Sequence, residues 1–140
     1  MSQPVIPQTE GETNISQLLR TMAPVRQPGT YVFCTVPTLT GLALDEVLGV
    51  FREAEGITVI LPQAVADQLQ LSYSYEAAWI TLTVHSSLAA VGLTAAFSYA
   101  LAQANISCNV VAAYYHDHIF VAATDAEPAL QALRQLANPA

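Results

Sequence analysis

The chain has 140 residues, of which 53% are hydrophobic and only 11% charged, and its net charge is -7. This length suits one domain or two very small ones that share a core, and the apolar content is too high for a disordered chain. With four arginines and no lysine, the chain lacks the cations that bind phosphates, which argues against nucleic acid and anionic membranes as partners. A surface so poor in charge instead indicates a homodimer or a higher homo-oligomer.

Neither the N-terminal segment nor the most apolar stretch predicts export or membrane insertion. Met1–Gln8 contains no basic n-region and no apolar h-region, so it does not resemble a signal peptide. The apolar stretch Leu88–Ala104 is shorter than the ~20 residues needed to span a bilayer, and Gly92 interrupts it. We therefore expect a cytoplasmic protein whose residues 1–13 are flexible.

The first half of the chain contains short elements that are broken by proline and glycine. Asn14 is placed to cap a short helix, and Tyr31–Val36 has the β-branched and aromatic content of a strand. Leu48–Arg52 and Ile57–Leu61 predict a hairpin. A further short helix is expected to begin at Pro62, because proline suits the first turn of a helix.

The second half begins with a strand and a long helix. Trp79–Val84 alternates between two faces, as a half-buried strand does. Ser86 or Ser87 is placed to cap the helix that follows and extends to Ala104. The residues expected on its buried stripe are Leu93, Phe97, Ala100, Leu101 and Ala104.

The second half ends with a hairpin and a last helix. Asn105 suits a left-handed cap at the end of the long helix. Cys108–Tyr114 and His118–Ala122 predict the two strands of the hairpin. Asp125 is placed to cap the last helix. Its inward-facing residues are expected to be Leu130, Leu133 and Leu136.

The order of elements repeats, which indicates two related units. The strand Tyr31–Val36 corresponds to Trp79–Val84, and each is followed by a hairpin and a helix. The long helix of the second unit corresponds to the shorter segment Thr38–Glu46 of the first. We therefore expect an α+β fold, with two antiparallel sheets and helices on one face.

Five segments carry a resemblance to a known family. In the second half these are His85–Leu88 (HSSL), Asn105–Val111 (NISCNVV) and Tyr114–Val121 (YYHDHIFV). In the first half they are Tyr31–Thr35 (YVFCT) and Phe51–Gly56 (FREAEG). Together they resemble stand-alone bacterial ACT-domain-containing proteins of unknown function, over roughly residues 16–136. The chain is also distantly similar to the ACT modules of cytosolic arginine sensors.

This resemblance implies a fold and a general role. It implies ferredoxin-like βαββαβ units in tandem, with a degenerate ACT-like half over residues 14–75 and an ACT-like domain over residues 76–140. ACT modules usually regulate amino-acid metabolism by binding an effector between two modules, without catalysis. The resemblance therefore implies a non-enzymatic, homo-oligomeric protein that binds an amino acid or a similar small carboxylate.

The candidate ligand site lies around the predicted start of the long helix. Unpaired N–H groups and the helix dipole at that end can hold a carboxylate without lysine or arginine, and Gly92 permits close approach. On the neighbouring strand, the Asn109 amide can bond both ends of an amino acid. Each of these residues can equally serve as a cap, a packing position or a backbone contact. The full candidate set is His85, Ser86, Ser87, Leu88, Gly92, Leu93, Asn109, Val110, Val111, Tyr114, His116 and His118.

Other functions have some support in the sequence. The histidines His85, His116 and His118 could bind a metal, but a hairpin turn would break the alternation that His-x-His ligation needs. A Ser–His–Asp nucleophile has less support, because no nucleophile-elbow glycines flank Ser86 or Ser87. The main alternative to a ligand-binding module is a structural or protein-interaction module without ligand, whose sheet edges and apolar faces bind another protein. We expect no metal, no cofactor and no catalysis.

Overall fold

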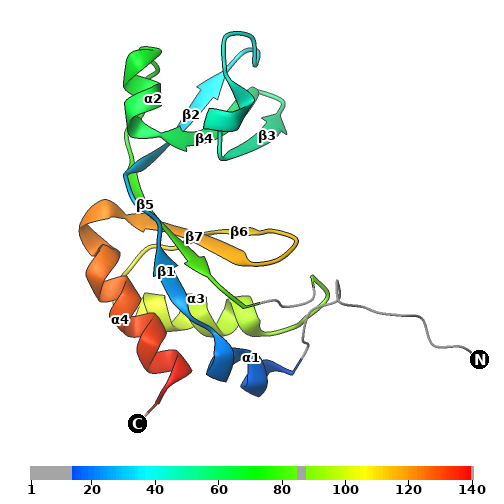
Figure 1. Cartoon of the computed structure of the whole chain (residues 1–140), viewed down its shortest axis with the longest axis vertical. Helices are drawn as coiled ribbons and strands as arrows, with labels where there is room; N and C mark the ends of the chain where they lie inside the picture. The colour runs from blue at the N-terminus through cyan, green and yellow to red at the C-terminus, as the bar shows by residue number, and fades with distance from the viewer. Residues whose placement is uncertain (1–13, 85–87, 140) are drawn as a thin grey trace, which may run out of the picture.

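The computed structural model describes residues 14–84 and 88–139. The elements in chain order are α1 (Ile15–Thr21), β1 (Pro24–Arg26), β2 (Tyr31–Val36), η1 (Leu44–Glu46), β3 (Gly49–Glu53), β4 (Gly56–Pro62), α2 (Gln63–Gln68), β5 (Glu76–Leu82), α3 (Leu93–Gln103), β6 (Asn109–Ala112), β7 (Asp117–Ala122), η2 (Ala123–Asp125) and α4 (Ala126–Ala137). Figure 1 shows α2 and β2–β4 in one half of the molecule and α1, α3 and α4 in the other. β5 connects the two halves.

All strand pairs in the described part of the chain are antiparallel and belong to one seven-stranded sheet. Its order is β3-β4-β2-β5-β7-β6, and β1 also pairs with β5. The expectation of two separate sheets is therefore wrong, because β2 and β5 pair through Tyr31↔Ala77 and Val32↔Glu76. The expected α+β fold of tandem ferredoxin-like units, with helices on one face, is confirmed.

The N-terminal elements pack with the C-terminal half. β1 pairs with the Ile80–Leu82 end of β5, and β2 pairs with the Glu76–Ala77 end. Since β7 occupies the other edge of β5, β1 and β2 follow each other along one edge. Leu18 and Met22 join the core around α3 and α4. α1 and β1 therefore pack with the second unit, although they precede residue 75 in the chain.

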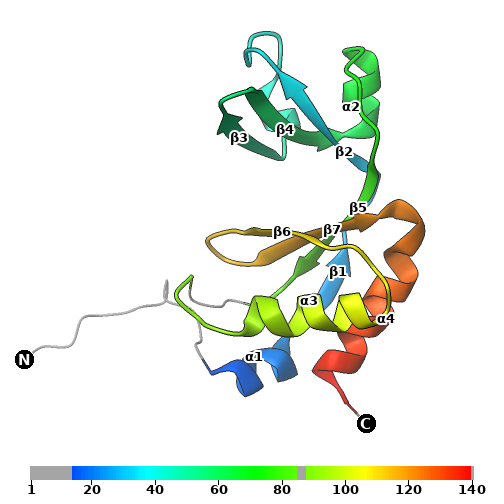
Figure 2. The same ribbon diagram turned by 180° about the vertical axis from the view of Figure 1, so that it is seen from behind.

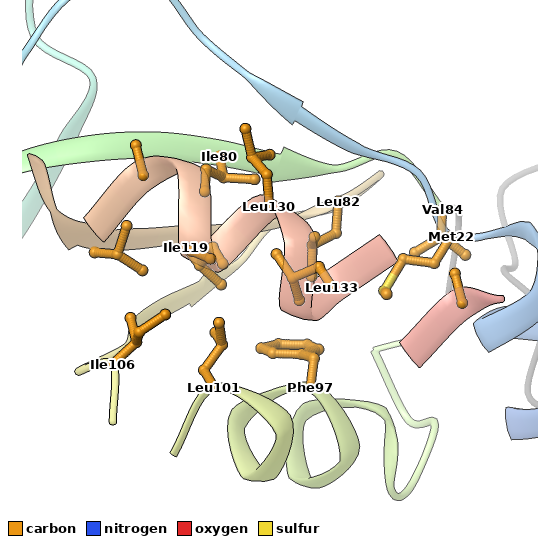
Figure 3. Close-up of a cluster of buried hydrophobic side chains, with 14 of the residues drawn as sticks. Met22, Ile80, Leu82, Val84, Phe97, Leu101, Ile106, Ile119, Leu130 and Leu133 are labelled. Atoms are coloured by element: carbon orange, nitrogen blue, oxygen red, sulfur yellow. The ribbon is translucent and has the colours of Figure 1, made fainter. Parts of the chain in front are cut away.

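Each half has its own apolar core beneath the helices. In the C-terminal half, strand side chains meet the inner sides of α3 and α4, and Met22 reaches in from the N-terminal segment (Figure 3). In the N-terminal half, α2 and the segment before β3 cover β2 and β4. Residues of the larger core include Leu18, Ile80, Leu82, Phe97, Leu101, Ile119 and Leu133.

Several predicted helix ends are confirmed. The Asn14 side chain accepts a hydrogen bond from the Gln17 backbone N–H at 3.1 Å, so it caps α1. Asn105 has φ 61°, the left-handed conformation expected after α3. Asp125 occupies the N-cap position of α4 but makes no capping hydrogen bond through its side chain.

Other predicted boundaries are wrong. α3 begins at Leu93 and its N-cap is Gly92, whereas Ser86 and Ser87 lie outside the described residues. Ala104 of the expected stripe is exposed and Ala100 is half-buried. β5 runs from Glu76 to Leu82 rather than from residue 79 to 84. The segment 38–46 contains only the short 3-10 helix η1.

Candidate functional site

The helix at the centre of the candidate site, α3, begins later than expected, at Leu93. Gly92 is the N-cap with φ 103°, a left-handed conformation that glycine adopts without strain, and no side chain caps the helix. Leu88 is 69% exposed, whereas Leu93 is 3% exposed and belongs to the core. Leu93 therefore cannot contact a ligand while the core is closed. His85, Ser86 and Ser87 lie outside the described residues.

The β6–β7 hairpin divides the remaining candidates between the two sides of the sheet. Val110 packs against the core beneath the helices. Asn109 and Val111 pair with Phe120 and His118, so they lie on the face of the sheet opposite α3 and α4, which we call the open face. The structure therefore brings Asn109, Val111 and His118 onto one face and separates them from Leu93 and Val110.

Two further candidates lie in the loop that connects β6 and β7. Tyr114 is 53% exposed and stacks edge-on against Tyr115, with ring centroids 5.0 Å apart. His116 is half-buried, and its Nδ1 lies 3.4 Å from the Val84 carbonyl oxygen. That contact fits an imidazole that donates to the backbone.

Aromatic side chains gather on the open face where the two halves meet. Tyr31 on β2 lies edge-on to Trp79 on β5, with centroids 5.2 Å apart and planes at 87°. Phe33 lies edge-on to Phe120 at 5.5 Å and to Tyr75 at 6.5 Å. Edge-to-face pairs at these separations are favourable beyond the area they bury. The open face therefore has a fixed aromatic surface.

A polar network fixes Trp79 and His118 on this face. The indole N–H of Trp79 donates to His118 Nδ1 at 3.0 Å, and Thr81 Oγ1 lies 3.1 Å from the same atom. Gln27 donates to Thr81 Oγ1 at 3.0 Å. Because the indole can only donate, Nδ1 must be unprotonated. Burial, and then the nearby His116, lowers the pKa of His118, which agrees with a neutral imidazole.

A cavity of about 260 Å³ lies at the junction of the halves, lined by Phe33, Tyr75 and Asn109. The Tyr75 hydroxyl is buried and has no hydrogen-bond partner among the described residues. The Asn109 amide makes a long contact of 3.5 Å to the Phe120 carbonyl. Burial, with a smaller contribution from Asp125, raises the pKa of Tyr75, so its hydroxyl stays protonated at neutral pH. The cavity thus combines an aromatic wall with an unused donor and an amide.

Two further cavities share Trp79 and Leu48 as lining residues. The larger has a volume of about 360 Å³, and its other lining residues are Tyr31, Asp45, Glu46, Val47, Pro62 and Val65. The smaller, of about 130 Å³, lies toward the β6–β7 hairpin. Its other lining residues are Ile60, Val111, Ala113, His118 and Phe120.

The described residues hold no constellation for metal binding. Within residues 14–84 and 88–139, no group of three or more His, Cys, Asp or Glu side chains could hold an ion. Burial raises the pKa of Asp117, and it raises the pKa of Cys108 to about 11, so that thiol is not a nucleophile at neutral pH. The same part of the chain contains no helix with the length and apolarity of a transmembrane span.

The sequence interpretation missed Phe33, Tyr75 and Trp79. In the strand around residue 80, Ile80 and Leu82 lie on one face and Trp79 and Thr81 on the other. The face with Trp79 is neither polar nor plainly part of the core. A face of that kind, mixing aromatic rings with hydroxyls, was a usable signal for a binding surface. No local pattern marked Tyr75, which lies just before β5.

Comparisons with known proteins agree with this architecture. Sequence profiles described as ACT domains match residues 10–78 and residues 74–135. A search of the curated proteins finds no significant match.

Solved structures share the fold. A Vibrio cholerae protein of unknown function, described as a possible transport protein, is 48% identical, with a TM-score of 0.79 over 88% of this chain and 95% of that one. An Agrobacterium tumefaciens protein is 15% identical, with a TM-score of 0.64 over 83% and 89%. The ligand-free regulatory subunit of aspartate kinase from Thermus thermophilus is 12% identical, with a TM-score of 0.61 over 84% and 97%. The last two similarities concern the fold alone.

ACT domains are typically regulatory modules that bind small molecules and have no catalytic activity of their own. With both halves matched by ACT profiles and nearly the whole chain shared with the Vibrio cholerae protein, this chain belongs to the ACT-domain family as a tandem of two such domains.

Proposed function

We propose that the protein is a non-catalytic regulator that binds an amino acid or a similar small carboxylate in the cavity lined by Phe33, Tyr75 and Asn109. The family supports a regulatory role, and regulatory subunits of aspartate kinase share the fold. The cavity receives Phe33 from β2 of the first unit and Asn109 from β6 of the second. A ligand there contacts both units.

The observation that carries this proposal is the buried Tyr75 hydroxyl, which has no hydrogen-bond partner among the described residues. A buried donor left unsatisfied costs about 1–3 kcal/mol, and an incoming acceptor recovers that cost. A ligand carboxylate is such an acceptor, and the Asn109 amide can donate to its second oxygen. Phe33 offers an apolar wall for the rest of the ligand.

The test begins with a thermal-shift screen against the proteinogenic amino acids and small carboxylates, followed by calorimetry on each hit. The diagnostic variant is Tyr75→Phe. It removes an oxygen that forms no bond in the free protein, so the unliganded protein should keep or slightly gain stability. Its affinity for the hit should fall by about tenfold, the equivalent of one lost hydrogen bond to a charged acceptor.

Tyr73→Phe is the matched control. The Tyr73 hydroxyl donates to Asp67 at 2.8 Å and accepts from Gln63 at 3.0 Å, and Tyr73 does not line this cavity. This variant should lose stability and keep the affinity for the ligand. Equal affinity of wild type and Tyr75→Phe for every hit would move the site away from Tyr75. A screen without hits would refute the binding function.

We also propose that the protein forms homo-oligomers, as ACT domains commonly do. Large apolar side chains lie exposed on the described surface, including Val91 (84%), Phe51 (72%) and Leu88 (69%). Exposed apolar area of this kind is typical of association surfaces. Sedimentation equilibrium at micromolar concentration should show a dimer or larger species, and a monomer would refute this proposal.

A further inference from the structure

We propose a second ligand site, specific for a small alkylammonium group, in the two cavities that share Trp79 and Leu48 as lining residues. It lies apart from the Tyr75 cavity and takes a different chemistry, so it stands or falls independently of the proposed carboxylate site. The larger cavity binds the ammonium and the smaller one takes the alkyl chain.

The aromatic walls of the larger cavity are held in place by their own polar atoms. The Tyr31 hydroxyl donates to the Pro28 carbonyl at 2.9 Å, and the Trp79 indole N–H donates to His118 Nδ1 at 3.0 Å. Both side chains line the cavity, and with those polar atoms engaged they offer it aromatic ring atoms rather than free polar groups. A cation beside such rings is attracted by the ring quadrupole, and tryptophan is the best of the aromatic side chains for this purpose.

The charge around the larger cavity has one sign. Asp45 and Glu46, from η1, line it, and no arginine does. Among the described residues, neither carboxylate forms an ion pair. Two carboxylates and two aromatic rings favour a cation and disfavour an anion, which distinguishes this site from a carboxylate site.

The smaller cavity shares Trp79 and Leu48 with the larger one, and most of its lining residues are apolar. Ile60, Val111 and Phe120 line it together with His118. Its volume of about 130 Å³ accommodates a short alkyl chain. The geometry therefore fits an amine with a hydrocarbon tail of a few carbons better than an inorganic cation.

The chain contains a single tryptophan, Trp79, so its fluorescence reports directly on this site. The full chain is titrated with n-butylammonium chloride at constant ionic strength, alongside 1-butanol and sodium butyrate. We expect a saturable change in emission with the amine at millimolar concentration. The neutral alcohol should bind at least about tenfold more weakly, and butyrate should not bind. Calorimetry on the same samples detects binding that leaves the emission unchanged.

Charge is tested with Asp45→Asn/Glu46→Gln, two exposed positions where the substitution keeps the side-chain shape. This variant should bind the amine at least about tenfold more weakly. The control Glu55→Gln/Glu127→Gln removes two equally exposed charges that do not line the cavities, and it should bind as the wild type does.

Three results would overturn the proposal. They are equal affinity for 1-butanol and the amine, equal affinity of the two double variants, and absence of binding by both fluorescence and calorimetry. The first would identify an apolar cavity without charge selection. The second would attribute the binding to the net negative charge of the protein.

Discussion

Phe97→Ala should destabilise the protein by about 3–5 kcal/mol. Phe97 is fully buried between α3 and the sheet, near Leu101 and Leu133 (Figure 3). Burial of a phenylalanine side chain contributes about 1.5–3 kcal/mol, and the cavity left by its truncation adds a comparable cost. Because small domains are stable by about 5–15 kcal/mol, this loss is a substantial share of the free energy of unfolding.

Urea unfolding followed by circular dichroism measures this loss, since the free energy falls linearly with denaturant. Tyr99→Ala is the control on the same helix, because Tyr99 is 66% exposed and bonds only to Gln103. It should change stability by no more than about 0.5 kcal/mol. A loss below about 1 kcal/mol for Phe97→Ala, or an equal loss for both variants, would show that α3 packs through a different face.

Three further substitutions test other features of the structure. Gly92→Ala should lower the free energy of unfolding by about 1–2 kcal/mol in urea melts, because alanine is strained at φ 103°. The new Cβ would make an ordinary contact with Ile15 at 3.5 Å, so the cost comes from the backbone, and an unchanged midpoint would contradict this conformation of Gly92. Burial raises the folded-state pKa of Asp117, so its stabilising contribution is present below its unfolded pKa of about 4 and lost as pH rises through the folded value. Asp117→Asn should therefore be more stable than wild type at about pH 7 and equal to it near pH 3, and the reverse order would refute this. Burial lowers the folded-state pKa of His118, so its contribution is present above about pH 6.5 and lost as pH falls through the folded value. His118→Asn keeps an acceptor for Trp79 and removes the titrating group, so the variant should lose less stability on acidification than the wild type. If stability depends on pH as it does in the wild type, other groups cause the loss.

The order of elements was predictable from the sequence because the local signals agree with the tertiary contacts. The β6–β7 hairpin has β-branched and aromatic strands with polar residues between them, and it pairs from Asn109↔Phe120 to Ala112↔Asp117. Leu130 and Leu133 recur at helical spacing and are buried, and Leu136 of the same stripe is half-buried. In these segments periodicity and burial reflect the same physical arrangement.

The start of α3 was not predictable from local propensity. Leu88–Val91 consists of good helix formers after two serines, which is typical of a capped helix. Gly92 instead adopts a left-handed conformation, which is incompatible with a continuing right-handed helix. A glycine within an apolar stretch is compatible with a helix that continues through it and with a helix that begins after it. The packing of Ile15 near Gly92 depends on the tertiary structure and is not visible in the local sequence.

The candidate site was predictable only in part. Asn109 was chosen for its amide chemistry, and it lines the cavity with Tyr75 and Phe33. That cavity exists because β2, the segment before β5, and β6 meet across two units, and no sequence spacing encodes such a meeting. The crossing of β1 to the second unit was equally hidden, because strand order in a sheet depends on long-range pairing.

The junction between the units is the part of the sheet where a small ligand has most influence. β2 and β5 pair only over Tyr31↔Ala77 and Val32↔Glu76, whereas β2–β4 and β5–β7 pair along their whole lengths. The units therefore have few backbone hydrogen bonds between them, and aromatic contacts such as Tyr31–Trp79 supply much of the rest. A ligand shifts a conformational equilibrium only by its difference in affinity between the two states. Because the cavities at Tyr75 and Trp79 border this junction, a ligand in either one contacts both units, and its binding free energy changes with their relative orientation. The same free energy applied within either helix-covered core would act on closely packed side chains and move them little.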